Sequence, residues 1–260
     1  MITGNSIDTS QLAAMVGQIY WPLVRIAGLV MVAPVFGAAY VTSRIKAGLI
    51  ILLTVIIIPG TDPVPAVQPL SAEALLITAT QLLIGVSIGY MILLVFNAIV
   101  VGGEAIATTM GLGYALINDP SNGVQVPILS QFYTVFATLL FLALNGHHVL
   151  IELLTVSFDY LPVGTRINGD MLWTIIDWSS VLFIGALGIA IPALASMLTV
   201  NLIMGIMTRA SPQLNIFSIG FPVTMTIGFV VILMTLPVVA SSFESLLDQG
   251  YNTISLWLEQ

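Results

Sequence analysis

Long apolar runs separated by short polar connections make up most of this 260-residue chain. A run of about 20 apolar residues can cross the hydrocarbon core of a bilayer, which is about 30 Å thick. The pattern therefore predicts an all-α protein of membrane-associated helical hairpins. The expected segments are roughly Leu12–Phe36, Ala47–Ile58, Ala74–Val101, Ile128–Leu144, Val149–Tyr160, Trp173–Met207 and Ile216–Leu247.

The segments differ widely in length, and prolines interrupt several of them. At 1.5 Å per residue, Trp173–Met207 would extend about 50 Å as one straight helix, whereas Ala47–Ile58 would reach only about 18 Å. Pro192 and Pro237 fall inside long apolar runs, where proline removes a backbone donor and kinks the helix. The carbonyls so freed need protein or water partners in an apolar region. We therefore expect kinked helices that pack against other protein.

Composition narrows the function classes. The chain is 58% hydrophobic and 7% charged, with a formal net charge of −7. Only five Lys and Arg residues are present, which argues against binding along nucleic-acid phosphates. Cysteine is absent, so disulfides and thiolate metal sites are excluded, and no cofactor is expected. Arg44 and Lys46 form the only basic pair and favour a cytoplasmic first loop, although so few charges leave the orientation open.

Two motifs have a chemical and a structural interpretation. Gly85-Val86-Ser87-Ile88-Gly89 matches the G-x-S-x-G elbow of hydrolases, but that elbow requires a strand before the serine. The same residues match G-x-x-x-G, a face for close helix packing, which we favour.

His147 and His148 are adjacent, and neighbouring side chains on a helix do not converge on a metal. We interpret them as a polar helix start at an interface or a protein contact.

Arg25 lies inside the first apolar segment, where a charge is costly. It either extends its side chain to a nearby aqueous interface or pairs with a carboxylate of this chain or of a partner. Glu104 and Asp177 are the other ionisable residues near apolar segments.

The stretch Gly102–Pro127 is unusually apolar for a connection. Gly102-Gly103 is expected to end the third helix, and Asp119-Pro120 and Asn122-Gly123 are turn signals. The stretch is either an ordinary connecting loop or a flexible apolar seal that closes a pore by excluding water. The residues that favour the seal are Met110, Gly111, Leu112, Gly113, Tyr114, Leu116 and Ile117.

The chain resembles the flagellar branch of the FliR/SctT export-gate family of type III secretion systems. The resemblance rests on short motifs whose order and spacing are specific over nearly the whole chain. They are Arg25–Leu29, Ala33–Gly37, Arg44, Met110–Gly113, Asp119-Pro120, Ser130–Tyr133, Leu139–Leu142, Gly146–His148, Ser157-Phe158, Leu161-Pro162, Arg209, Pro212–Asn215 and Phe217–Pro222.

The resemblance implies a single-copy subunit in a helical hetero-oligomer with five FliP-like and four FliQ-like subunits. It implies contact with FlhB-like and FlhA-like export components and a place in the bacterial inner membrane, within the flagellar basal body. Residues 1–172 would form a FliP-like region and residues 173–260 a FliQ-like hairpin that turns at about Arg209–Gln213. A loop at about Ile106–Asn122 would plug the channel through which unfolded flagellar proteins pass, with Asp119-Pro120 setting its turn.

The subunit-contact candidates are Arg25, Glu104, His147, His148, Arg209, Pro212, Gln213 and Asn215. No P-loop or acid–base pair close in sequence indicates an enzyme. The alternatives are a small secondary transporter with broken helices and, less favoured, a membrane hydrolase that uses Ser87.

Overall fold

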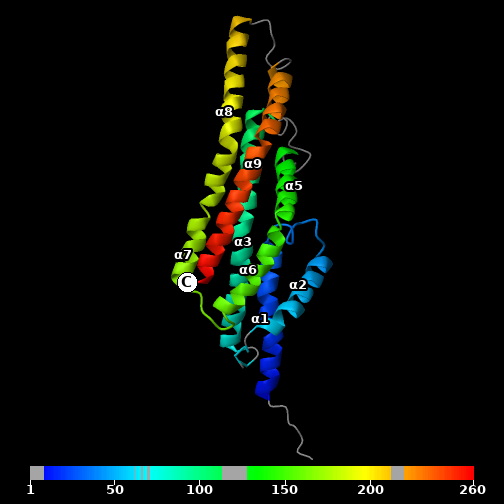
Figure 1. The fold of residues 1–260 in the computed structure, drawn as a ribbon, viewed down its shortest axis with the longest axis vertical. Coiled ribbons are helices and arrows are strands. Elements are labelled where there is room, and N and C mark those ends of the chain that lie inside the picture. Colours follow the sequence, from blue (N-terminus) through cyan, green and yellow to red (C-terminus); the bar gives the residue numbers. More distant parts are fainter. Residues whose placement is uncertain (1–8, 62, 66, 69–70, 113–127, 212–219) are drawn as a thin grey trace, which may run out of the picture. The chain divides into compact units, whose positions relative to one another are not determined.

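The computed structural model describes residues 9–61, 63–65, 67–68, 71–112, 128–211 and 220–260. Within these ranges the chain forms helices and connections without a strand, so the all-α prediction is confirmed. Figure 1 labels the helices in chain order. They are α1 (Thr9–Val32), α2 (Ser43–Ile57), the 3-10 turn η1 (Ile58–Gly60), α3 (Ala72–Thr109), α5 (Ile128–Ala143), α6 (Gly146–Tyr160), α7 (Gly169–Trp178), α8 (Val181–Ala210) and α9 (Phe221–Leu258).

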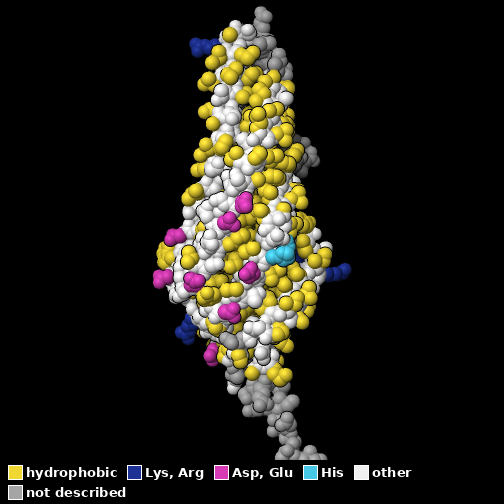
Figure 2. Space-filling view, in the orientation of Figure 1, with side chains coloured by type: hydrophobic (Ala, Val, Ile, Leu, Met, Phe, Trp, Pro, Cys, Tyr) yellow, Lys and Arg dark blue, Asp and Glu magenta, His cyan; other side chains and the backbone are white. Residues whose placement is uncertain are grey.

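The apolar character predicted from the sequence persists on the folded surface. Figure 2 shows hydrophobic side chains spread over the visible face, with only isolated charged ones. By length and composition, five helical stretches of the described chain are suited to cross a membrane, or six if α5 and α6 together form one broken span.

The chain divides into two compact units. Unit 1 contains Met1–Leu93, Asn145–Ser179 and Gln249–Gln260; unit 2 contains Leu94–Leu144 and Ser180–Asp248. Helices α3 and α9 contribute residues to both units. The predicted division after residue 172 concerns likeness to two other proteins and stays a prediction.

In unit 1, α1 and α3 approach so closely that glycine is required at the contact. A Cβ on Gly28 of α1 would lie 2.7 Å from the carbonyl oxygen of Leu82. A Cβ on Gly85 of α3 would overlap the carbonyl oxygen of Arg25, and one on Gly89 would lie 3.0 Å from the backbone nitrogen of Ala33. The G-x-x-x-G interpretation of Gly85–Gly89 is therefore confirmed. Because these residues lie inside α3, the serine between them follows no strand.

In unit 1, hydrogen bonds from two indole groups connect α7 with α9 and with α3. Trp257, fully buried near the end of α9, donates from Nε1 to the carbonyl of Met171 in α7 (2.9 Å). Trp178, the last residue of α7, donates from Nε1 to the carbonyl of Met91 in α3 (3.0 Å). A buried indole usually needs a partner for its N–H, and here that partner is backbone.

Unit 2 packs the second half of α3 against α5, α8 and α9. The ring of Phe96 on α3 makes edge-to-face contacts with Phe141 of α5 (5.4 Å between centroids) and Phe243 of α9 (5.3 Å). Such pairs add about 0.5–1.5 kcal/mol to area burial. The antiparallel helices α8 and α9 lie beside each other (Figure 1), and a Cβ on Gly185 would lie 2.9 Å from Cδ1 of Leu246.

One expectation about a helix end was wrong. Gly102 and Gly103 do not end the third helix, which continues to Thr109. They accept close neighbours instead, since a Cβ on Gly102 would lie 3.0 Å from the carbonyl oxygen of Ala186 and one on Gly103 would overlap the ring of Tyr133. Segment 173–207 is interrupted, in line with the expectation of broken helices, because a turn at 179–180 separates α7 from α8.

The glycine contact between α1 and α3 predicts the effect of adding one methyl group. Gly85→Ala places its Cβ into the α1 backbone, so we expect a loss of about 1–3 kcal/mol in the free energy of unfolding, as for other overpacked sites. Gly48→Ala is the matched control, because a Cβ at this helical position meets nothing within 4 Å. Helix propensity predicts that the control gains up to about 1 kcal/mol. Denaturant unfolding of the purified chain in detergent measures both, and equal stabilities of the two variants would contradict the packing.

Candidate gating segment and buried arginine site

The described part of the candidate gating segment is a fixed helix cap. The amide of Gly111 donates to the carbonyl of Thr108 and the amide of Leu112 donates to the carbonyl of Ala107, both at 3.1 Å. Gly111 has φ +85°. This pair of hydrogen bonds around a left-handed glycine is a Schellman motif, which satisfies the last carbonyls of α3. Met110–Leu112 therefore end the helix in one defined conformation.

Helices α8 and α9 hold this cap from the side. Met110 is fully buried, and its side chain lies over Gly228 of α9, where a Cβ would come within 2.6 Å of the methionine Cε and Cγ. Asn201 of α8 donates from Nδ2 to the carbonyl of Thr109 at 3.4 Å. The chain thus leaves α3 from a point that two other helices of unit 2 fix in place.

The remaining plug candidates follow this anchor in the sequence. Gly113, Tyr114, Leu116, Asp119 and Pro120 lie outside the described residues, so their assignment stays a prediction. Ile106 belongs to α3, which means that the predicted loop at 106–122 begins with helix and cap.

Arg25 is the centre of a second site, in the interior of unit 1. Its side chain is fully buried. Nε donates to Oε1 of Gln81 on α3 (2.8 Å), Nη1 donates to the carbonyl of Ser157 on α6 (2.7 Å) and to its hydroxyl (3.1 Å), and Nη2 donates to the carbonyl of Leu161 (2.6 Å). The guanidinium carbon lies 4.1 Å from the centre of the Phe158 ring.

These partners explain how a cation is tolerated inside an apolar unit. Leu161 is the C-cap of α6, so both carbonyls belong to the end of that helix, which carries partial negative charge. The carbonyl of Ser157 also accepts from the amide of Leu161 (3.1 Å), whereas the carbonyl of Leu161 lies past the last hydrogen bond of the helix. The aromatic face of Phe158 adds a cation–π contact. Arg25 therefore joins α1, α3 and the end of α6 through the geometry that guanidinium offers and lysine lacks.

This arrangement differs from both hypotheses for Arg25. Its side chain does not extend to the surface, and the partners found are an amide, a hydroxyl and two carbonyls. Neither Asp177 nor Glu104 supplies them; both carboxylates are exposed. Because the guanidinium lies in the interior, an effect of Arg25 on subunit assembly would act through the fold of unit 1. Its role as a subunit contact stays a prediction.

The other contact candidates are distributed over both units. In unit 2, Glu104 is exposed on α3 and Arg209 is exposed in the last turn of α8, where a cation suits the helix dipole. In unit 1, His147 and His148 lie in the first turn of α6 with ring centroids 4.0 Å apart. Pro212, Gln213 and Asn215 lie outside the described residues.

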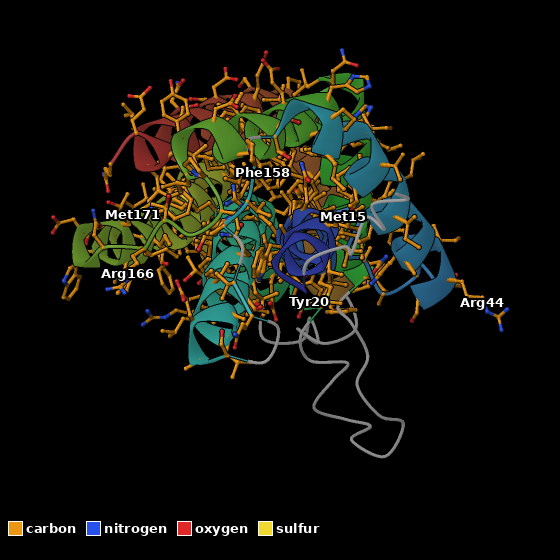
Figure 3. All side chains as sticks on the ribbon, turned by 90° about the horizontal axis from the view of Figure 1, so that it is seen from below. Met15, Tyr20, Arg44, Phe158, Arg166 and Met171 are labelled. Carbon is orange, nitrogen blue, oxygen red and sulfur yellow. The ribbon has the colours of Figure 1, made fainter. Side chains whose placement is uncertain are left out.

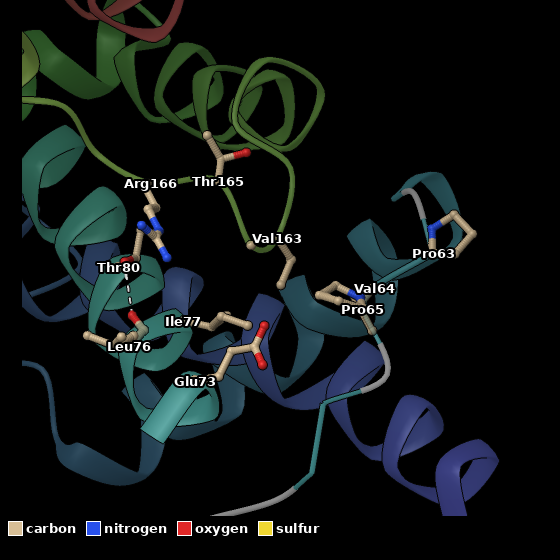
Figure 4. Close-up of a pocket in the computed structure, with 11 residues that line it drawn as sticks. Pro63, Val64, Pro65, Glu73, Leu76, Ile77, Thr80, Val163, Thr165 and Arg166 are labelled. Carbon is tan, nitrogen blue, oxygen red and sulfur yellow. Dashed lines mark hydrogen bonds between the residues drawn. The ribbon is translucent and has the colours of Figure 1, made fainter. Parts of the chain in front are cut away.

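Unit 1 also contains a surface hollow of about 560 Å³ between the start of α3, the connection that precedes α3 and the connection between α6 and α7 (Figure 4). Glu73 and Arg166 are its charged lining residues, and both are exposed. The hydroxyl of Thr80 donates to the carbonyl of Leu76 within α3 (2.9 Å), so it is engaged in the helix. We assign this hollow no chemistry.

The sequence analysis missed the residues that complete both sites. Gln81 is one of two side-chain amides in the apolar helix α3, and Gly228 is one of two glycines in α9; each is a recognisable signal of a buried polar partner or of close packing. The carbonyl partners of Arg25 carry no side-chain signal, because any residue presents a carbonyl.

The chain is similar to known export proteins over nearly its whole length. The profile of the bacterial export proteins, family 1, matches residues 16–250. The flagellar biosynthetic protein FliR of Escherichia coli (strain K12) is 34% identical over 250 residues, which cover 96% of this chain and 95% of that protein. FliR of Pectobacterium carotovorum subsp. carotovorum is 34% identical over 261 residues, covering 100% and 98%. FliR of Bacillus subtilis (strain 168) is 29% identical over 220 residues, covering 83% and 85%.

The Arg25 site predicts a large loss of stability from truncation. Arg25→Ala leaves the amide oxygen of Gln81 and the carbonyl of Leu161 without these donors, each an unsatisfied buried group that costs about 1–3 kcal/mol, whereas the carbonyl of Ser157 keeps the amide of Leu161 as a donor. We expect a total loss of about 3 kcal/mol or more, and most of that loss in Arg25→Lys as well, because one ammonium cannot reproduce the fork of a guanidinium. Arg44→Ala, at an exposed position, is the control and should change the free energy of unfolding by no more than about 0.5 kcal/mol.

Unfolding of the three variants in one detergent measures these differences. A stability of Arg25→Ala equal to that of Arg44→Ala would show that the buried network contributes nothing to the fold.

Proposed function

We propose that this chain is a subunit of the flagellar protein export gate, and that it lines and closes the channel for unfolded flagellar proteins. The proposal rests on its family, because the chain belongs to the bacterial export proteins, family 1. The relatives named as flagellar biosynthetic proteins are matched over most of their own length, which supports transfer of the role as a whole.

In this proposal the chain is one copy in a helical hetero-oligomer with five FliP-like and four FliQ-like subunits, next to FlhB-like and FlhA-like components. It resides in the inner membrane at the flagellar basal body. Residues 1–172 correspond to a FliP-like region and residues 173–260 to a FliQ-like hairpin. The chain acts passively and is not an enzyme; the position of Ser87 inside α3 is consistent with that role.

The end of α3 is the observation that carries the gating part of the proposal. Met110 and Gly111 form a fixed cap seated on α9, and Asn201 of α8 holds the carbonyl that precedes it. The segment that follows contains glycines, Tyr114 and Leu116, which are small or apolar. A firm anchor followed by an apolar segment suits a seal, because the seal must return to one place after substrate has passed. Closure by dewetting requires apolar groups at the constriction.

We expect removal of residues 113–118, with the Met110–Leu112 cap retained, to make the assembled complex permeable to ions and small solutes. A second variant replaces the same six residues by Gly and Ser, which keeps the length and removes the apolar groups. Conductance of the complex purified with its partner subunits in a planar bilayer measures both. We expect both variants to leak, and a tight channel formed by an intact complex of either variant would contradict the plug.

The anchor predicts a separate, smaller effect. Gly228→Val displaces the buried Met110 side chain, so the segment starts from a shifted position and we expect intermittent openings. Gly205→Val on α8 is the control, because a Cβ there meets nothing within 4 Å. If Gly228→Val seals as well as Gly205→Val at equal assembly yield, the seat of Met110 does not contribute to closure.

Purification distinguishes the proposal from a small secondary transporter. An export-gate subunit should elute from mild detergent with several apolar partner proteins. A monomer or homodimer that binds a small solute would favour the transporter.

A further inference from the structure

We infer that α2 is a lipid-contacting helix of the chain, with its outer face against phospholipid acyl chains and Arg44 at the headgroups of an anionic leaflet. Besides Ala47 and Gly48, the outer face carries bulky aliphatic side chains, each more than half exposed: Ile45, Ile51, Leu52, Val55 and Ile56. This inference is independent of the plug, because it concerns a different helix and a different contact.

The length of α2 suits a bilayer better than the lengths of the longest helices do. The apolar stretch Ser43–Gly60 has 18 residues, which gives about 27 Å at 1.5 Å per residue, close to the hydrocarbon thickness of about 30 Å. The 38-residue helices α3 and α9 would each exceed that thickness nearly twofold. Buried residues form 22% of the most apolar window of α2, compared with 44% in α1 and 67% in α3; α9, at 17%, is similarly uncovered but is longer than a bilayer core requires.

The opposite face of α2 explains how the helix is held. Its buried residues are Ile50, Leu53, Thr54 and Ile57, and α2 packs against α1. The hydroxyl of Thr54, on this buried face, donates to the carbonyl of Ile50 (2.6 Å) and therefore has a hydrogen-bond partner within the helix. One face is therefore covered by the chain and the other is uncovered along the full helix.

The chemistry of the uncovered face favours lipid over a partner helix. Helices that pack on other helices in membranes use small or polar residues at the contact. Past Gly48, the exposed positions Ile51, Leu52, Val55 and Ile56 are all bulky and aliphatic. The exposed face of α8 mixes bulky side chains such as Leu198 and Leu202 with Ser196, Thr199 and Asn201. Acyl chains match the uniformly aliphatic surface of α2 beyond Gly48.

Charge at the start of α2 identifies the lipid class. Arg44 is exposed, and its side chain is directed away from the helices of unit 1 (Figure 3). Lys46 donates from Nζ to the carbonyl of Gly37 (2.8 Å), so it fixes the turn that leads into α2. Tyr40, 70% exposed, precedes them. A free arginine and an exposed tyrosine at the end of an apolar helix suit the interface of an anionic leaflet, whose negative surface potential attracts basic residues.

The absence of cysteine allows a direct test on the full chain, assembled with its partner subunits in nanodiscs of phosphatidylethanolamine and phosphatidylglycerol. Spin labels on Leu52→Cys and Val55→Cys should collide readily with oxygen, which concentrates in acyl chains, and rarely with a water-soluble nickel chelate. Leu53→Cys, on the buried face, is the matched control and should be shielded from both. Shielding from both reagents at residues 52 and 55 would mean that protein covers the face, and access to nickel would mean that water does; either result overturns the inference.

The role of Arg44 has its own readout. A fluorophore on Leu52→Cys should be quenched at least twofold more efficiently by brominated phosphatidylglycerol than by brominated phosphatidylcholine. Arg44→Ala should abolish this preference, and Arg44→Lys should retain it. The same preference in all three proteins would refute an anionic contact at Arg44.

Discussion

The close approach of α1 and α3, with Arg25 at its edge, is the constraint on which unit 1 depends. Gly28 and Gly85 let the two backbones meet without side chains between them. That distance brings the guanidinium of Arg25 to Gln81 on α3 and to the last carbonyls of α6. A larger residue at either glycine would separate the helices and remove the partners that make a buried cation tolerable. The close packing of α1 on α3 and the hydrogen bonds of Arg25 therefore depend on each other.

Unit 2 uses the same principle for a different purpose. Gly102 and Gly103 admit α8 and the Tyr133 ring to the surface of α3, so that this helix runs unbroken to Thr109. Gly228 then accepts Met110 at the end of α3. Close packing here determines the point from which the proposed gating segment starts. The proposed gate depends on such a fixed point for its closed position.

Periodicity and composition predicted the helical class and the membrane character, and the short motifs predicted a family resemblance that the match over residues 16–250 confirms. These signals failed where contacts of backbone atoms determine the local structure. Gly102-Gly103 was interpreted as a helix stop because glycine lowers helix propensity, but propensity yields to packing when a neighbour needs the space. The partners of Arg25 could not be predicted, because backbone carbonyls are present at every residue and only the tertiary fold selects two of them. The turn between α7 and α8 lies at Ser179 and Ser180, two residues that give no strong turn signal within an apolar run.

Hydrogen exchange of the Arg25→Lys variant against the parent chain tests the central claim most directly. If Arg25 joins α1, α3 and α6 into unit 1, backbone amides of unit 1 should lose protection first at α1 residues 21–32, α3 residues 78–92 and α6 residues 153–160. Amides of unit 2, including those of α5 and α8, should keep the protection of the parent. Unchanged exchange in all three helices of unit 1, or an equal loss throughout both units, would contradict the account.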